Sequence, residues 1–205
     1  MKGRKHITRF TIVMVMAVLA VGVFAGAALA SDDANVSLAG GTLGVTGFAV
    51  PDFTGYTLDG AAHVLKVQPA TFTVTDATGL GAGWQVQVTA HVMTNAGYVV
   101  GQNPAVNVGK NLDANALELL AIPAPTKVDD TSSAIPSIID RTSKWIDSGS
   151  AITIASAAAD GTGMGAYLFT PPADSLVLHV PAKAYAGAYH TTLIIDTISG
   201  PYDPD

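Results

Sequence analysis

Cysteine is absent from this sequence of 205 residues, and glutamate occurs only once, as Glu118. Without cysteine, thiol catalysis, thiolate metal sites and a disulfide scaffold are all excluded. An exported domain of about 175 residues can form a core without disulfides, because the buried share of its surface approaches about 70% at this length. Charged residues make up only 13% of the chain. Alanine, threonine, valine and glycine are frequent, which is typical of an extracellular, β-rich protein.

Catalytic motifs are lacking as well. The chain has no Gly-x-Ser-x-Gly elbow, no zinc-protease His-Glu pair and no phosphate-binding loop. A glycosidase needs two opposed carboxylates in a cleft, whereas the aspartates here are scattered through predicted turns. We therefore predict a protein that is not an enzyme and that has no cofactor.

The N-terminus has the pattern of a secretory signal peptide. A basic segment, 1–9, precedes an almost unbroken apolar run, 10–26, and Ala28-Leu29-Ala30 forms an A-x-A cleavage site before Ser31. The alternative is an uncleaved membrane anchor, which requires about 20 apolar residues and different flanks. We expect cleavage after Ala30, so that residues 1–30 are the signal peptide and residues 31–205 form a single secreted domain.

Removal of the signal peptide changes the charge balance. Four of the ten basic residues leave with it and all sixteen acidic residues remain, so the mature chain carries six basic residues and a formal net charge of −10. This charge argues against nucleic acid and anionic lipid as partners. Binding to an anionic wall polymer would need hydrogen bonds, aromatic stacking or a bridging cation. No LPxTG-like sorting motif occurs before Asp205, so we expect retention at the cell surface by binding and no covalent linkage.

Alternation with a period of two dominates the chain after Ser31. Its clearest case starts at Trp84, where one face carries Trp84, Val86, Val88, Ala90 and Val92. A second alternating stretch, 72–75, precedes a glycine-containing connection, and we expect the two to form a hairpin. Further short strands are expected at 36–37, 42–45, 64–67, 99–101, 151–155 and 166–170.

The C-terminal region repeats this pattern on both sides of a turn. Leu176, Leu178 and Val180 are expected to face inward with His179 outward, and Tyr189 begins another alternating stretch after the turn. Ala186-Gly187-Ala188-Tyr189 is similar to the tyrosine corner of Ig-like sandwiches, in which the hydroxyl bonds back to the preceding loop. The predicted fold class is all-β, an antiparallel β-sandwich of Ig-like or similar type.

Residues 111–148 interrupt the alternation with prolines, an aspartate pair and Ser/Thr clusters. We expect a long loop insertion there, with a short helix at 113–120, and no second domain, because its apolar residues are few and scattered.

Two motif blocks resemble the WxL domain family, whose members are surface proteins of Gram-positive bacteria that attach non-covalently to the cell wall. The first block has an aspartate, a glycine-containing loop and a Gly-Trp-x-apolar strand start; its residues are Asp76, Gly79, Gly81, Gly83, Trp84 and Val86. The second lies near the C-terminus and matches at Tyr189, Leu193 and Pro201, with Ile198 near the position of the family's second leucine. Two positions depart from the family pattern: Val86 stands for leucine, and Ile195 stands where a second tryptophan belongs.

The resemblance implies wall-contacting residues, for which we take Trp84, Val86 and Tyr189 as candidates, and we add Trp145 because of its polar surroundings. Trp84 is either a sugar-stacking residue or a core residue, and its inward register favours the core. Trp145 lies in a polar stretch, where exposure is expected, so it is the better candidate for an exposed contact. If the family's paired tryptophans contact glycan, Ile195 removes half of that platform; if they are core residues, isoleucine is a tolerable apolar replacement.

Metal binding is weakly indicated. His91, His179 and His190 fall on outward positions without short metal-ligand spacing, so solvated strand histidines are the favoured interpretation. The segments 129–130 and 160–165 resemble calcium loops only in composition, and turn formation explains them better.

Two functions follow as hypotheses. The first is a secreted, non-enzymatic WxL-like protein that associates with peptidoglycan or an associated wall glycan, with other surface proteins as further partners. The alternative is a structural subunit of an extracellular pilus-like fibre or surface layer, assembled by strand addition at an exposed edge.

Overall fold

The computed structural model describes residues 36–97, 107–139 and 142–203. The expected signal peptide, 1–30, and the expected strand at 99–101 lie outside the described residues. The chain divides into two units after Leu38, and residues 39–205 form one compact unit. Every secondary-structure element named in the described residues is a β-strand, and all of their pairings are antiparallel. The all-β, antiparallel class predicted from the sequence is therefore confirmed.

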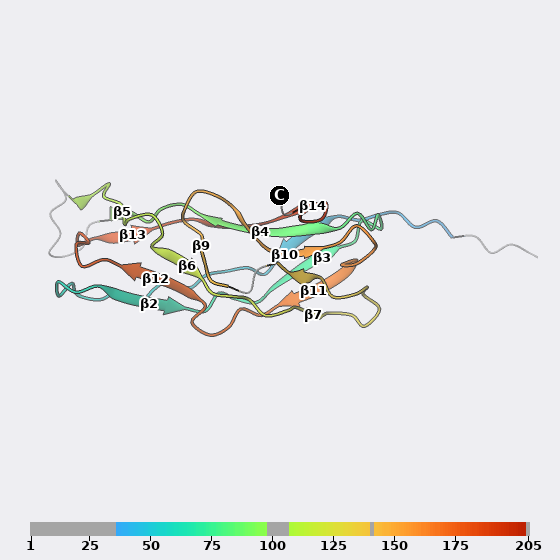
Figure 1. The fold of residues 1–205 in the computed structure, drawn as a ribbon, viewed down its shortest axis with the longest axis horizontal. Helices are drawn as coiled ribbons and strands as arrows, with labels where there is room; N and C mark the ends of the chain where they lie inside the picture. The colour runs from blue at the N-terminus through green and yellow to red at the C-terminus, as the bar shows by residue number, and fades with distance from the viewer. Residues whose placement is uncertain (1–35, 98–106, 140–141, 204–205) are drawn as a thin grey trace, which may run out of the picture. The chain divides into compact units, whose positions relative to one another are not determined.

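The strands form three four-stranded sheets and one two-stranded sheet (Figure 1). The first has the order β1 (Leu43–Thr46), β3 (Phe72–Asp76), β11 (Gly165–Phe169), β7 (Thr126–Lys127). The second has the order β14 (Leu193–Ser199), β4 (Trp84–Ala90), β10 (Ile152–Ala157), β8 (Ser137–Ile138). The third has the order β2 (His63–Val67), β12 (Leu176–Val180), β6 (Leu117–Leu119), β9 (Lys144–Trp145). The small sheet pairs β13 (Ala188–His190) with β5 (Thr94–Gly97).

The strand that begins at Trp84 has the alternation that its sequence predicts. Trp84, Val86, Val88 and Ala90 are buried, and the residues between them are partly exposed. Val92 lies beyond the end of β4 and is half-buried. Since strand side chains point to opposite faces in turn, this single period explains why one face of β4 contributes so much of the core.

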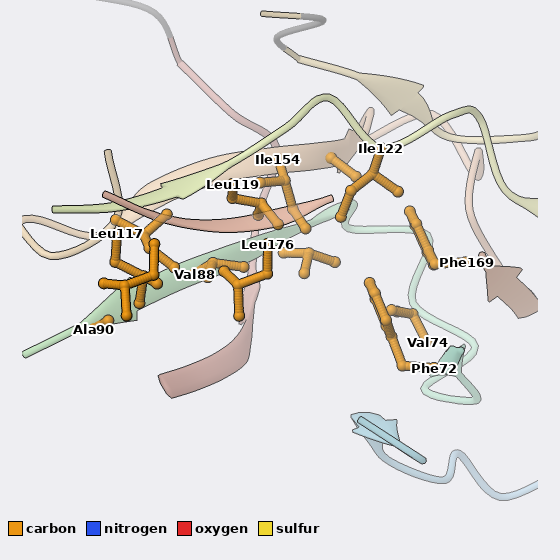
Figure 2. Packing of buried hydrophobic residues seen from close by; sticks show 14 of the residues in the cluster. Phe72, Val74, Val88, Ala90, Leu117, Leu119, Ile122, Ile154, Phe169 and Leu176 are labelled. Atoms are coloured by element: carbon orange, nitrogen blue, oxygen red, sulfur yellow. The ribbon is translucent and has the colours of Figure 1, made fainter. Parts of the chain in front are cut away.

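Aromatic rings fill the core beside β4. Phe72 of β3 and Phe169 of β11 stack in parallel with ring centroids 4.9 Å apart (Figure 2). Trp84 of β4 lies 6.3 Å from Tyr167 of β11, so this contact joins two different sheets. Tyr167 and Trp84 are both fully buried. The contact between Trp84 and Tyr167 therefore packs the first sheet against the second.

The expected hairpin between 72–76 and 84–88 is wrong. β3 pairs with β1 and β11, whereas β4 pairs with β14 and β10. The connecting loop, 77–83, has glycines at positive φ and carries the chain from one sheet to another. A local sequence pattern identifies each strand but not its partner, which here is distant along the chain.

Residues 111–148 are also different from the expected long loop. They contribute the short strands β6, β7, β8 and β9 to all three of the four-stranded sheets. The expected helix at 113–120 is wrong, because Leu117–Leu119 is a strand with both leucines buried. Three residues are too few to show a period of two clearly, and pairing with β12 supplies the hydrogen bonds that fix this strand.

The remaining strand predictions have mixed outcomes. Strands near 42–45, 64–67, 151–155 and 166–170 are confirmed within about two residues, the usual uncertainty of element ends. No strand forms at 36–37. In the C-terminal region, Leu176, Leu178 and Val180 are buried, and His179 between them is partly exposed.

Candidate functional site

The four candidate contact residues occupy different environments. Trp84 and Val86 are both 0% exposed, and the indole N–H of Trp84 donates a hydrogen bond to the Gly163 carbonyl at 2.9 Å. Neither side chain presents a surface to a ligand, so both would affect binding only through folding. Trp145 is 39% exposed on β9, whereas Tyr189 is half-buried on β13. The structure therefore places the two accessible candidates on different sheets.

Trp145 lies on the outward face of the third sheet, as the burial of the next residue shows. Ile146 is fully buried, which turns the preceding Trp145 away from the core. Trp145 is directly opposite Glu118 in the register between β9 and β6. On β12, burial of Leu178 and Val180 places His179 on the same outward face. Three residues from three strands are thus brought together.

We call this group the Trp145 platform, which consists of Trp145, His179 and Glu118. The Trp145 and His179 rings are edge-to-face, with centroids 4.9 Å apart. His179 Nε2 lies 2.9 Å from Glu118 Oε2. The side chains of His179 and Glu118 are 39% and 18% exposed. The partly exposed indole can stack against a ligand. The adjacent carboxylate and imidazole can accept and donate hydrogen bonds.

The charge of Glu118 is stabilised by its neighbours. A hydrogen bond from the Ser143 side chain lowers the pKa of Glu118 below its ordinary value of 4.5, and the contact with His179 lowers it further, although partial burial opposes both. Ser143 therefore bonds to the carboxylate, which is not the nucleophile-to-base contact of a catalytic triad. The group resembles a binding surface more than a nucleophilic site.

The lowered pKa of Glu118 predicts a pH-dependent contribution to stability. Because the native pKa is below the unfolded value, the contribution is complete above about pH 4.5 and is lost as the pH falls through the native pKa. We expect Glu118→Gln to melt at a lower temperature than the unmodified protein at neutral pH. The difference should shrink as the pH falls below 4.5. Thermal melting from neutral to acidic pH measures this.

Asp113→Asn is the matched control for that experiment. Asp113 forms an ion pair with Lys183 at 2.9 Å, but the two side chains are 64% and 75% exposed. Exposed pairs contribute little to stability because solvent screens them. A difference between Glu118→Gln and the unmodified protein that persists unchanged into acid would contradict the assignment.

A second feature is a cleft of about 1200 Å³ with a mixed polar and apolar lining, which we call the cleft. Its apolar lining includes Leu65 of β2, Leu178 of β12 and Leu193 of β14. Tyr189 lies in its wall, and its hydroxyl donates a hydrogen bond to the Tyr185 carbonyl at 2.9 Å. This bond to the preceding loop is the one expected from the sequence around Gly187.

The acidic turns and the histidines have local roles. Asp129 Oδ1 accepts a hydrogen bond from the Thr131 N–H at 2.7 Å, and Asp160 Oδ1 accepts one from Thr162 N–H at 2.9 Å. Both are side-chain turns of the kind that aspartate favours. In the described ranges, no group of three or more metal-ligating side chains is close enough to hold an ion. Those same ranges contain no helix long and apolar enough to cross a membrane.

Sequence reasoning identified part of the Trp145 platform. The sequence indicates Trp145 and His179 as outward-facing residues, but it does not indicate Glu118, because its pattern predicts a helix at 113–120 where the structure has a strand. The signal was its position between Leu117 and Leu119, both of which are buried. No family model, characterised protein or solved structure matches this chain. The WxL resemblance therefore rests on the two sequence motifs alone.

Proposed function

We propose that this chain is an exported, non-enzymatic protein that associates non-covalently with bacterial cell-wall glycan through the Trp145 platform. The observation that carries the proposal is the exposed Trp145 indole, held edge-to-face by His179 beside the Glu118 carboxylate. An indole packs against the apolar face of a sugar ring, and the adjacent polar groups accept and donate hydrogen bonds to hydroxyls. This combination suits a neutral or amino sugar better than a charged polymer.

The charge of the mature chain supports recognition of this kind. After removal of the signal peptide the chain has a formal net charge of −10, so long-range electrostatic forces repel an anionic polymer. Affinity must then come from short-range stacking and hydrogen bonds, which the Trp145 platform supplies. Peptidoglycan, whose sugars carry amide and hydroxyl groups, is the wall component that this chemistry favours.

The tryptophan positions of the WxL motifs have a structural role in this chain. Trp84, in the first motif, is buried, and Ile195, in the second, is half-buried against the same core. Ile195 is opposite Val88 in the register of β14 with β4. Both motifs thus describe core packing in this chain, where replacement of tryptophan by isoleucine is an apolar exchange. The wall contact itself is assigned to Trp145, outside the motifs.

Replacing Trp145 with alanine is expected to weaken wall binding about tenfold, because loss of an aromatic stacking contact costs about 1.4 kcal/mol. Folding should be almost unaffected, since the side chain is partly exposed. The measurement is cosedimentation of the mature protein with isolated Gram-positive walls and with purified peptidoglycan, together with a thermal melt. Trp145→Phe should restore part of the affinity because it keeps a ring.

Tyr202→Ala is the matched control, since Tyr202 is also a partly exposed aromatic residue, at 37%. It should bind like the unmodified protein. Equal binding by Trp145→Ala and the unmodified protein would overturn the assignment of the site. Failure of the unmodified protein to sediment with either wall preparation would overturn the proposed function.

A further inference from the structure

The walls of the cleft carry two sheet edges. Leu65 and Leu193, both in its lining, belong to β2 and β14. In the described residues, β2 has a single hydrogen-bonded neighbour, β12, and β14 also has a single one, β4. β14 also lies close to β1, so β2 is the edge strand with which an added segment can pair. A cleft that has apolar side chains in its lining and an edge strand in its wall is a site where an extended segment can add as a strand.

One wall of the cleft is attached only by side chains. Residues 50–58, which we call the strap, line the cleft and have no regular secondary structure. Within the described ranges, no backbone hydrogen bond joins the strap to another segment. Val50, Phe53 and Tyr56 pack against the core, but the Tyr56 hydroxyl is buried without a hydrogen-bond partner. The strap therefore covers the core without completing a sheet.

An exposed apolar segment precedes the first strand of the described residues. Residues 36–39, which we call the N-terminal arm, precede β1 and form no strand. Val36 and Leu38 are 83% and 88% exposed. They are two residues apart, so in an extended segment both side chains point to the same side. Such a segment can insert two apolar side chains into a groove while its backbone pairs with an edge.

The compact unit begins at the end remote from the cleft. Gly41 N–H donates to the Ala77 carbonyl at 2.7 Å, directly after β3 ends. The neighbouring end of the second sheet is where Trp84 is opposite Ser199, and the cleft lies toward Leu193, opposite Ala90. Six residues of strand separate these ends, about 20 Å. A neighbouring copy is therefore a natural acceptor for the arm.

We propose that the N-terminal arm of one copy enters the cleft of a second copy and adds there as a strand, with Val36 and Leu38 packed against its apolar lining. The contact is heterologous, because the arm and the cleft are different surfaces at different ends. Repetition of such a contact gives an open, head-to-tail chain of subunits. The assembly is independent of the Trp145 platform, which lies on another face of the third sheet.

The absence of cysteine allows a direct test. Leu38→Cys places a thiol on the arm, and Tyr185→Cys places one at the cleft, whose lining includes the 45% exposed Tyr185. When the two mature variants are mixed and oxidised, we expect a disulfide-linked heterodimer on a non-reducing gel. A variant with both cysteines should give a ladder of oligomers. Adding Val36→Asp to the arm variant should reduce cross-linking at least tenfold.

Val128→Cys is the matched control, because Val128 is 58% exposed and does not line the cleft. It should not cross-link with Leu38→Cys above background. Val36→Asp alters an exposed side chain, so an unchanged melting temperature should accompany its effect. Three results overturn the proposal: absence of the heterodimer, equal cross-linking to Val128→Cys, or an internal disulfide in monomers of the double variant, which would place the arm in its own cleft.

Discussion

Replacing Trp84 with alanine is expected to lower the free energy of unfolding by about 3–5 kcal/mol, the usual cost of truncating a large buried aromatic residue. Trp84 is 0% exposed, and its ring lies 6.3 Å from the Tyr167 ring of the first sheet. Its indole N–H also donates to the Gly163 carbonyl. Alanine removes both the ring and the donor, so a cavity and an unpaired buried carbonyl remain. For a domain of ordinary stability, this is a large part of the total.

Chemical unfolding followed by circular dichroism measures this cost. Trp84→Phe separates the two contributions, since it keeps most of the apolar volume but loses the hydrogen bond to Gly163. Trp145→Ala is the control of the same residue type, and we expect it to cost far less because Trp145 is 39% exposed. Wall binding by Trp84→Ala should decline in parallel with its folded fraction. A stable Trp84→Ala that has lost binding would show that Trp84 contacts the ligand.

Strands with a clean alternation could be predicted from the sequence because burial on one face is a local property. β4 shows this well: its hydrophobic residues at every second position are the buried ones. The tyrosine corner is similar, since the bond from Tyr189 to Tyr185 spans only four residues. In both cases the residues that determine the structure are only a few positions apart, so the sequence pattern predicts it.

Partner choice could not be predicted in the same way. β3 and β4 are neighbours in the chain, yet their partners are β11 and β14, far along the sequence. The short strands between 117 and 145 gain their hydrogen bonds from distant elements such as β12, and three residues alone show no period. Non-local pairing, which local propensity does not encode, decides these features.

The same distinction explains the candidate site. Trp145 and His179 were identified because each stood out in its local sequence, but their contact depends on β6 lying between β9 and β12. Glu118 belongs to that intermediate strand, so its role followed only from the register opposite Trp145. For a site assembled across three strands, the sequence therefore indicates only those residues that stand out locally.

Gly83, directly before Trp84, provides the second large effect. Gly83→Ala is expected to lower the free energy of unfolding by about 2–5 kcal/mol. Its φ of 73° is in the left-handed region, which costs a residue with a Cβ about 1–2 kcal/mol. A Cβ there would also lie 2.5 Å from the Ala157 carbonyl oxygen and 2.8 Å from the Ala158 carbonyl carbon. Because both are backbone atoms of a paired strand and its extension, overpacking adds about 1–3 kcal/mol.

Gly79→Ala isolates the steric part of that cost. Gly79 is in the same loop with a φ of 70°, but a Cβ at this position would meet nothing within 4 Å. Its expected cost is therefore only the conformational cost of a positive φ, about 1–2 kcal/mol, which Gly83→Ala also incurs. Urea unfolding of the two variants, compared at constant m-value, measures the difference. Equal destabilisation would contradict the close approach of Gly83 to β10. A clearly larger loss of unfolding free energy for Gly83→Ala would show that the fold requires this close approach. Through it, the loop between the first and second sheets positions Trp84.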